Sequence, residues 1–169
     1  LGDSRAGLHL ITHKMKANSK EFKALRNAHL IPKAYLREGR FLARLGGVHA
    51  MIDVSDGLSS DMAHIAEQSN VGVRLYSEKM PVSYNLKKFC DRFDFDPVEY
   101  ALAGGEDYTL LCTIIPDKMD RIAANYLKRF RNPLYQIGEI TDSGKMELML
   151  WNGEITSFAP SGWDHFKTE

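Results

Sequence analysis

The feature that most constrains how this chain can fold is the stretch at residues 53–58, with the sequence DVSDGL. The residues just before it, VHAMI, are mostly small and apolar, which is typical of a strand. After it, apolar residues recur with the 3.6-residue period of a helix, at Leu58, Met62, Ile65 and Ala66. The chain is therefore expected to change from strand to helix within this stretch.

This turn carries two carboxylates, a hydroxyl and a glycine. The carboxylates of Asp53 and Asp56 are hard oxygen ligands, which suit Mg²⁺ bound together with substrate phosphates. Gly57 has no Cβ, so a ligand can approach the backbone there, and the amides at the start of the helix attract anions. Metal beside phosphate is what phosphoryl transfer requires. The simpler alternative is structural: Asp56 or Ser55 caps the helix, and Asp53 is a polar strand end facing water.

Two further stretches have a similar double interpretation. Residues 104–108, GGEDY, precede the most apolar run of the chain, residues 110–115, which is apolar on both faces and predicts a central, doubly covered strand. Taken alone, GGEDY is better explained as a turn whose glycines supply positive φ and whose acids are solvated. Residues 162–166, GWDHF, form an aromatic-rich tail that either covers the core or stacks on a flat ligand ring.

Charge and composition exclude several classes of function. Lys plus Arg and Asp plus Glu both total 22, so the formal net charge is zero and nothing favours electrostatic binding to nucleic acid. No apolar run approaches the roughly 20 residues of a membrane span. Cys90 and Cys112 occupy apolar positions of periodic segments, which predicts reduced core thiols rather than a disulfide or a zinc site. These features favour an ordinary cytoplasmic domain.

Periodicity along the whole chain predicts an α+β fold. Helices are expected near residues 8–15, 19–28, 34–45, 58–69, 83–93 and 119–130, with Ser19 and Ser83 as N-caps. Strands are expected at residues 48–53, 71–75, 108–115, 134–140, 146–151 and 154–158. Asn152-Gly153 predicts a two-residue hairpin turn, and the DSG sequence at 142–144 predicts a second short turn. The prediction is a set of helices on one face of a mixed or antiparallel sheet that ends in a β-meander.

The stretches 53–58, 104–108 and 162–166, in this order, resemble thiamine-monophosphate kinase, a family of the aminoimidazole-ribonucleotide-synthetase-like (AIR synthetase-like) superfamily of ATP-using enzymes. Residues 1–8 and 77–83 also resemble parts of that family, so the resemblance covers essentially the whole chain. It implies a fold like the AIR synthetase C-terminal domain.

Family members have an N-terminal half that holds most of the Mg²⁺ ligands and the ATP pocket. The resemblance therefore implies that this chain is the C-terminal half of such an enzyme. Residues 1–46 are expected to be a helical lead-in from the preceding half, and residues 47–169 to be the AIR synthetase-like domain. The missing half is the expected partner, and the full-length protein is expected to be a homodimer. The isolated chain is expected to have no kinase turnover.

The reaction implied by the resemblance is attack of thiamine monophosphate on the γ-phosphorus of ATP, giving thiamine diphosphate and ADP. Transfer in this family is direct and in line, with several Mg²⁺ ions, so that catalysis is mostly positioning and charge neutralisation. The resemblance implies Mg²⁺ ligands at Asp53 and Asp56, with Asp56 catalytic, an ATP phosphate contact at Ser55, and substrate binding at Glu106 and Trp163. A cationic thiazolium beside an acid and an aromatic face is physically sensible.

One departure from the family pattern is visible. Family members tend to read His-Leu-Arg-Pro-x-x-Arg after a helix, whereas residues 29–35 here read HLIPKAY. Ile31 and Tyr35 thus replace both arginines, which puts in doubt any role of those arginines in joining the halves or meeting phosphate. Lys33 or Arg37 would have to compensate.

Three other polar residues are expected to be structural. His29, near a helix end, is expected to act as a C-terminal cap that suits the helix dipole. Arg5 is expected to be solvated on the first turn of its helix, and His64 to lie at the surface or in a satisfied position.

Two alternative functions stay open. The first is another enzyme of the same superfamily, such as a selenophosphate synthetase or a hydrogenase-maturation factor, which would use a different acceptor. The second is a non-catalytic module that only folds and binds. The GGEDY and GWDHF stretches favour the thiamine assignment over the first alternative.

Overall fold

Residues 53–58 join a strand to a helix, as the sequence predicts, because β1 (Val48–Asp53) ends where the stretch begins and α4 (Leu58–Ser69) starts at its last residue. The computed structural model describes residues 1–13 and 22–161. The other helices are α1 (Asp3–Thr12), α2 (Lys23–Leu30), α3 (Leu36–Arg44), α5 (Tyr84–Phe93), α6 (Pro97–Ala103) and α7 (Met119–Phe130). The other strands are β2 (Gly72–Tyr76), β3 (Leu110–Ile114), β4 (Gly138–Thr141), β5 (Met146–Met149) and β6 (Ile155–Ser157).

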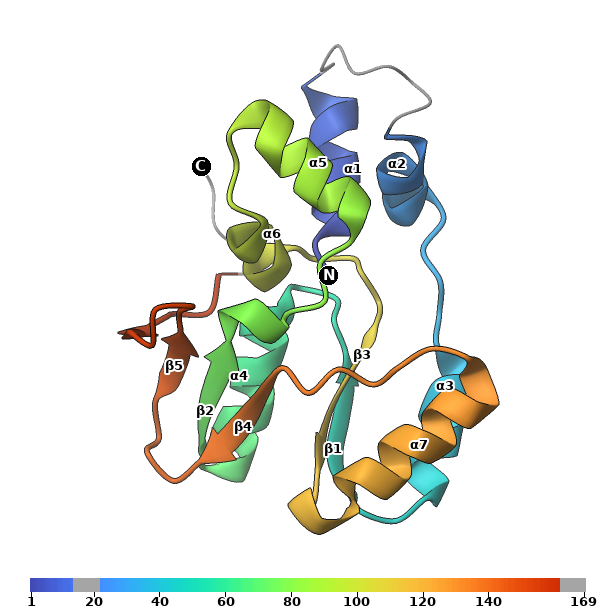
Figure 1. Ribbon diagram of the computed structural model, residues 1–169, viewed down its shortest axis with the longest axis vertical. Coiled ribbons are helices and arrows are strands. Elements are labelled where there is room, and N and C mark those ends of the chain that lie inside the picture. The colour runs from blue at the N-terminus through green and yellow to red at the C-terminus, as the bar shows by residue number, and fades with distance from the viewer. Residues whose placement is uncertain (14–21, 162–169) are drawn as a thin grey trace.

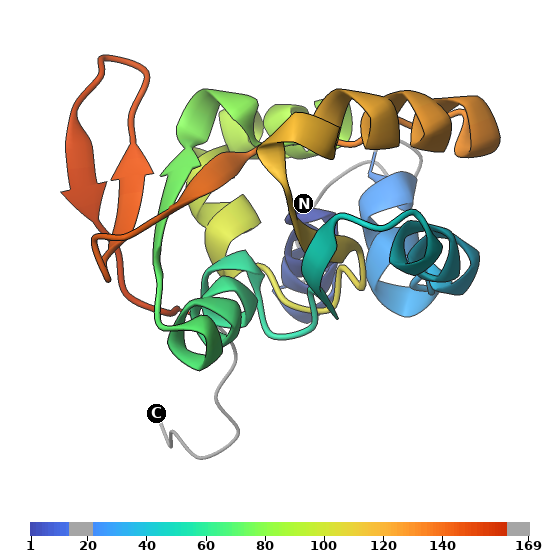
Figure 2. The same ribbon diagram turned by 90° about the horizontal axis from the view of Figure 1, so that it is seen from below.

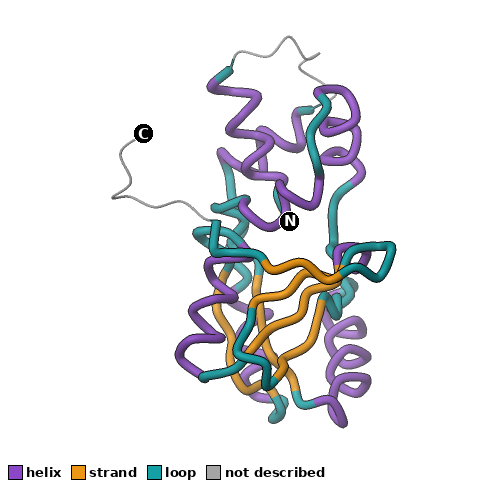
Figure 3. The backbone as a smooth tube through the Cα atoms, turned by 90° about the vertical axis from the view of Figure 1, so that its left-hand side faces the viewer, coloured by secondary structure: helices purple, strands orange, loops and turns teal. Residues whose placement is uncertain are grey.

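The molecule has a helical end and an end that contains the strands (Figures 1 and 3). Helices α1, α2, α5 and α6 gather at the first end, whereas α3, α4 and α7 lie beside the strands. Fully buried aromatic side chains such as Phe22 and Phe89 form the core of the helical end. In the other end, Leu58 of α4 joins Val73 and Leu111 of the strands in a second core cluster. Core packing of Leu58 therefore fixes the last residue of the DVSDGL stretch.

The strands form two sheets. β1 and β3 pair antiparallel, with Met51 opposite Cys112 and Asp53 opposite Leu110. The second sheet has the order β4-β2-β5-β6 and is mixed, since β2 pairs antiparallel with β4 and parallel with β5. Figure 2 shows β2, β4 and β5 to one side of β1 and β3. The α+β class and the mixed strand pairing are thus confirmed.

The predicted meander of the last strands is wrong in one respect, because β2 lies between β4 and β5. The turn that joins β4 to β5 passes over the end of β2. Gly72 permits this close passage, since a Cβ there would lie 2.5 Å from the side-chain oxygens of Thr141 and Ser143. A short turn therefore connects two strands that are not neighbours.

The hairpin between β5 and β6 is confirmed, although its loop is one residue longer than predicted. The Leu150 N–H donates to the Glu154 carbonyl at 2.8 Å, which leaves three residues in the loop. Gly153 adopts a φ of +82°, the left-handed conformation typical of the last residue of such a loop. Trp151, in the same loop, is 79% exposed.

The apolar run at residues 110–115 is covered on both faces, as predicted, but it is not a central strand. Leu111 faces the cluster around α4, whereas Leu110 and Cys112 face a third cluster formed by α3 and α7. Among the described residues, β3 pairs only with β1. The run is therefore apolar on both faces because helices pack against both faces, and not because strands pair with both of its edges.

Helix α6 is absent from the sequence-based prediction, although two signals for it were present. The Asp96 carboxylate caps it by accepting the Val98 N–H at 2.8 Å, and Pro97 occupies the first helical turn. The predicted cap of α5 is confirmed, since the Ser83 hydroxyl accepts the Leu86 N–H at 3.0 Å. Within the described ranges, no helix is both long and apolar enough to traverse a lipid bilayer.

Both cysteines are free thiols, as predicted. Burial raises the pKa of Cys90 to about 11, and the nearby carboxylates of Asp96, Asp91 and Glu99 add to the shift. At pH 8 only about one thousandth of this thiol is then the reactive thiolate. We expect iodoacetamide to leave Cys90 unmodified in the native protein and to modify it readily in urea, as mass spectrometry would measure. Native labelling at the urea rate would contradict this burial.

Candidate functional site

The loop between β1 and α4 is held by the carboxylate of Asp61, one turn into the helix. Asp61 Oδ2 accepts hydrogen bonds from the backbone N–H groups of Ser55 at 3.0 Å and of Asp56 and Gly57 at 3.2 Å. The Asp61 residue is 1% exposed. Neither Asp56 nor Ser55 caps the helix, because its N-cap is Gly57, which makes no side-chain cap hydrogen bond, and Asp61 binds the amides of the preceding loop instead.

Asp61 binds amides of the loop that precedes α4, whereas the sequence predicts anion binding at the amides of the helix start itself. Burial raises the pKa of its carboxyl and the charge of Asp56 acts in the same direction, whereas the three amide hydrogen bonds oppose the rise. The N–H groups of residues 55–57 thus already bind a carboxylate of the protein itself. A phosphate bound here would use other donors, such as the amides of the first turn of α4 or the Ser55 hydroxyl.

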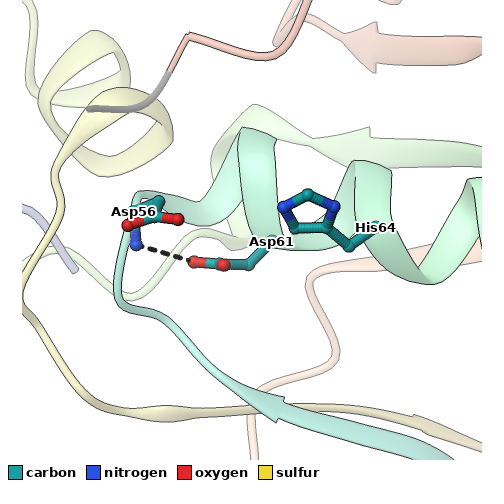
Figure 4. A group of neighbouring side chains, drawn as sticks. All are labelled: Asp56, Asp61 and His64. Atoms are coloured by element: carbon teal, nitrogen blue, oxygen red, sulfur yellow. Dashed lines mark hydrogen bonds between the residues drawn. The ribbon is translucent and has the colours of Figure 1, made fainter. Parts of the chain in front are cut away.

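A small group of candidate metal ligands surrounds this loop (Figure 4). Asp56, Asp61 and His64 each place one ligand atom within 4.8 Å of the others. Asp56 is half-buried, and its carboxylate makes no hydrogen bond or ion pair with any residue that the structure describes. Asp53 is exposed at the end of β1 and does not join the group.

The donor set fits Mg²⁺ through its oxygens. Mg²⁺ binds one or two carboxylates, substrate phosphates and water, and it disfavours nitrogen ligands. Asp56, with an uncommitted carboxylate, is the natural ligand, whereas Asp61 has one oxygen already saturated by three amides. His64 is exposed and offers only a ring nitrogen, so it adds little for this metal.

The GGEDY stretch lies directly against the DVSDGL stretch. The Glu106 N–H donates to the Ser55 carbonyl at 2.7 Å, and the Tyr108 N–H donates to the Val54 carbonyl at 2.8 Å. Glu106 and Tyr108 have left-handed φ values of +61° and +48°, which are uncommon for residues with a Cβ. Two acidic stretches that are distant in sequence therefore form one site.

Close backbone contact between these stretches depends on Gly105. A Cβ at this position would lie 2.8 Å from the Ser55 carbonyl oxygen. We expect Gly105→Ala to push the stretches apart and to lower the free energy of unfolding by about 1–3 kcal/mol, as overpacking does elsewhere. Urea unfolding measures the change. Gly39→Ala is the matched control, because its Cβ would meet its nearest neighbour at an ordinary 3.5 Å, and equal losses in both variants would contradict the contact.

The two acids of GGEDY have different partners. Asp107 caps α1, because its carboxylate oxygens accept the Gly2 N–H at 2.6 Å and the Ser4 N–H at 3.3 Å. Glu106 Oε2 lies 3.0 Å from His29 Nδ1, and the Glu106 side chain is 53% exposed. Asp107 is therefore a structural residue, whereas the Glu106 side chain is half exposed to solvent.

His29 is not the helix cap that the sequence predicts. The backbone N–H of Ile31 closes α2 by donating to the Asn27 carbonyl. The His29 ring instead contacts Glu106 and the Ser4 hydroxyl, at 3.0 and 3.1 Å. No local sequence signal indicates this role, because both partners of His29 are remote in sequence.

Arg5 and Lys33 each pair with a glutamate of the protein. Arg5 donates to the Glu99 carboxylate at 3.2 Å and lies over the Tyr100 ring. Lys33 donates to Glu38 at 3.0 Å, so its charge is used within its own segment.

The C-terminal aromatic stretch, including Trp163, lies outside the described residues. Ser161, the last described residue before it, has defined contacts. The Ser161 N–H donates to the buried Ser59 hydroxyl at 3.1 Å, in the first turn of α4. The chain thus enters the GWDHF stretch from a point beside the DVSDGL loop.

Comparisons with known proteins identify the family of this chain. A family described as AIR synthase related protein, C-terminal domain, matches residues 1–150. The thiamine-monophosphate kinase of Aquifex aeolicus is 36% identical over 166 residues, which are 98% of this chain and 49% of that protein. The enzyme of the same name from Haemophilus influenzae is 35% identical over 170 residues, 99% of this chain and 50% of that protein. The chain thus spans about half the length of these curated relatives.

Solved structures show the same likeness. AaThiL complexed with AMPPCP and TMP superimposes with a TM-score of 0.81 at 33% identity, over 98% of this chain and 48% of that one. Escherichia coli HypE superimposes with a TM-score of 0.73 at 15% identity, over 99% of this chain and 48% of that one, which shows a shared fold alone. The family match and the shared fold together establish that this chain belongs to the AIR synthase related proteins, as their C-terminal domain.

Proposed function

We propose that this chain is the C-terminal half of an ATP-dependent thiamine-phosphate kinase. The observation that carries the proposal is the 36% identity to a thiamine-monophosphate kinase over 98% of the chain. A second support is the TM-score of 0.81 to AaThiL, a protein that was solved with AMPPCP and TMP. The proposed substrates are accordingly ATP and thiamine monophosphate.

The residues of the site suit a direct phosphoryl transfer. Asp56, with its uncommitted carboxylate, would hold Mg²⁺, and exposed Asp53 is the second proposed ligand. When bound, Mg²⁺ supplies charge neutralisation for the phosphates. The Ser55 hydroxyl would contact an ATP phosphate, and Asp61 keeps this loop in place through its amide hydrogen bonds.

The substrate side of the proposed site rests on Glu106 and Trp163. The Glu106 side chain is 53% exposed, and its backbone lies against the DVSDGL loop, since its N–H donates to the Ser55 carbonyl. A carboxylate there would attract the cationic thiazolium ring, and an aromatic face would stack on it. Trp163 is two residues beyond Ser161, which is bound to Ser59 beside the loop.

The remaining parts of the proposal concern the whole protein. Because most Mg²⁺ and ATP contacts are expected in a preceding half, we propose that the chain alone is inactive. Homodimer formation, a cytoplasmic location and a domain boundary between residues 46 and 47 stay predictions.

The test is to incubate the full-length protein with ATP, Mg²⁺ and thiamine monophosphate and to measure thiamine diphosphate by chromatography. Formation of this product supports the proposal. Because another enzyme of the superfamily, such as a selenophosphate synthetase, would use a different acceptor, selenide should be assayed in parallel. ATP consumption only with another acceptor would keep the fold and reject the thiamine assignment.

A further inference from the structure

We propose that His29 is a positioning residue that holds the Glu106 carboxylate toward a cationic substrate. The inference rests on the proposed function, because it takes Glu106 as the acid that meets the thiazolium ring. His29 Nδ1 lies 3.0 Å from Glu106 Oε2, and the His29 side chain is 18% exposed. The Glu106 side chain is 53% exposed, so it contacts His29 on one side and is open to solvent on another.

The contact is a close approach of a ring nitrogen to a carboxylate oxygen. His29 Nδ1 lies 3.0 Å from Glu106 Oε2, and in such a pair only the ring can be the donor, since a carboxylate can only accept. The same nitrogen lies 3.1 Å from Ser4 Oγ, in a hydrogen bond whose donor depends on the tautomer of the ring. The His29 ring therefore lies against one Glu106 oxygen and limits the rotation of the Glu106 side chain.

The ring is itself held by α1. Ser4 is 1% exposed, and its backbone N–H donates to Asp107, the residue that follows Glu106. Ser4 is thus linked to the GGEDY stretch in two ways. Its backbone N–H binds Asp107 directly, and its hydroxyl contacts the His29 ring, which in turn contacts Glu106.

A glycine in α1 allows the close approach that this arrangement needs. A Cβ at Gly7 would come within 3 Å of the Leu25 backbone carbonyl and 3.1 Å from the His29 Cβ. Glycine in a helix interior costs about 1 kcal/mol relative to alanine, so its presence indicates that contact between α1 and α2 matters. This contact brings His29 to Glu106.

Holding Glu106 reduces the ordering that substrate binding would otherwise require. Glutamate is among the side chains that lose most rotamer freedom on ordering, and a preorganised acid avoids part of that loss. The expected consequence concerns the affinity for thiamine monophosphate and leaves ATP binding and the transfer step nearly unchanged.

The test compares His29→Ala and His29→Asn in the full-length protein. The side-chain N–H of asparagine can take the place of Nδ1, so His29→Asn should retain near-normal behaviour. His29→Ala should raise the KM for thiamine monophosphate by about 10-fold, the approximate cost of ordering a free glutamate side chain on binding. The kcat and the KM for ATP should each change less than about twofold, since a lone loss of ground-state binding appears in one KM.

Two further variants separate positioning from general damage. In the double variant His29→Ala with Glu106→Gln, the KM should be no higher than in Glu106→Gln alone, because both changes remove one interaction. His49→Ala, at an exposed position of β1, is the control and should resemble the wild type.

The outcomes distinguish failure of the inference from failure of the proposed function. Absence of thiamine diphosphate with the wild type would reject the proposed function and the inference with it. An active wild type with an unchanged KM in His29→Ala would overturn the inference alone. Equal defects in His29→Ala and His29→Asn, or matching rises in both KM values, would also overturn it.

Discussion

Replacement of Asp56 by asparagine is expected to lower the kcat of the full-length protein by about 100-fold or more. The reason is electrostatic: Asp56 is the half-buried carboxylate of the loop without a partner among the described residues, and it stands where a cation would be held. Losing one preorganised group that stabilises transition-state charge commonly costs a factor of 100 to about 1000. Asparagine keeps the shape of the side chain, so the fold should persist.

The measurement is product formation as a function of Mg²⁺ concentration, for the wild type, Asp56→Asn and the control Asp91→Asn. Asp91 is an exposed carboxylate of α5, away from the DVSDGL loop, and its replacement should leave kcat unchanged. If Asp56 holds the metal, Asp56→Asn should also need a higher Mg²⁺ concentration for half-maximal rate. A normal kcat in Asp56→Asn would remove this residue from the proposed mechanism.

The parts of this structure that could be predicted from sequence are those set by local patterns. The apolar period after residue 57 predicts α4, and Ser83 predicts the start of α5, since both signals lie within one element. The position of β2 between β4 and β5 depends on pairing over a long distance and on the absent Cβ of Gly72. Neither a short turn nor an alternating pattern carries that information.

The same distinction applies to the site. Asp56 and Glu106 stand out in sequence because each lies among glycines and acids at the end of a strand or turn. Their juxtaposition arises from backbone hydrogen bonds between loops remote in sequence. Asp61 carries a recognisable signal, since it is an acid in the first turn of a helix, but Ser55 and Asp56 precede the helix directly and predict simpler caps. His29 has no local signal, since its role exists only when α1, α2 and the GGEDY stretch meet.

Asp61→Ala is expected to destabilise the protein by about 3 kcal/mol or more, the largest stability effect that the structure predicts. The variant would leave the N–H groups of Ser55, Asp56 and Gly57 without their common acceptor. Each buried donor left unsatisfied costs about 1–3 kcal/mol, and charged acceptors are the strongest partners. The loop would also lose the connection that sets the direction of Asp56.

Urea unfolding of the wild type, Asp61→Ala and Asp61→Asn measures this cost. Asparagine retains one carbonyl oxygen at the position of the acceptor, so its loss should be roughly half that of alanine or less. Glu67→Ala, which removes an exposed carboxylate from the same helix, is the control and should change the stability by no more than about 0.5 kcal/mol. Equal stability of Asp61→Ala and Glu67→Ala would mean that the three amides find other partners. In that case the loop that carries Asp56 would owe its shape to β1 and Leu58 rather than to Asp61.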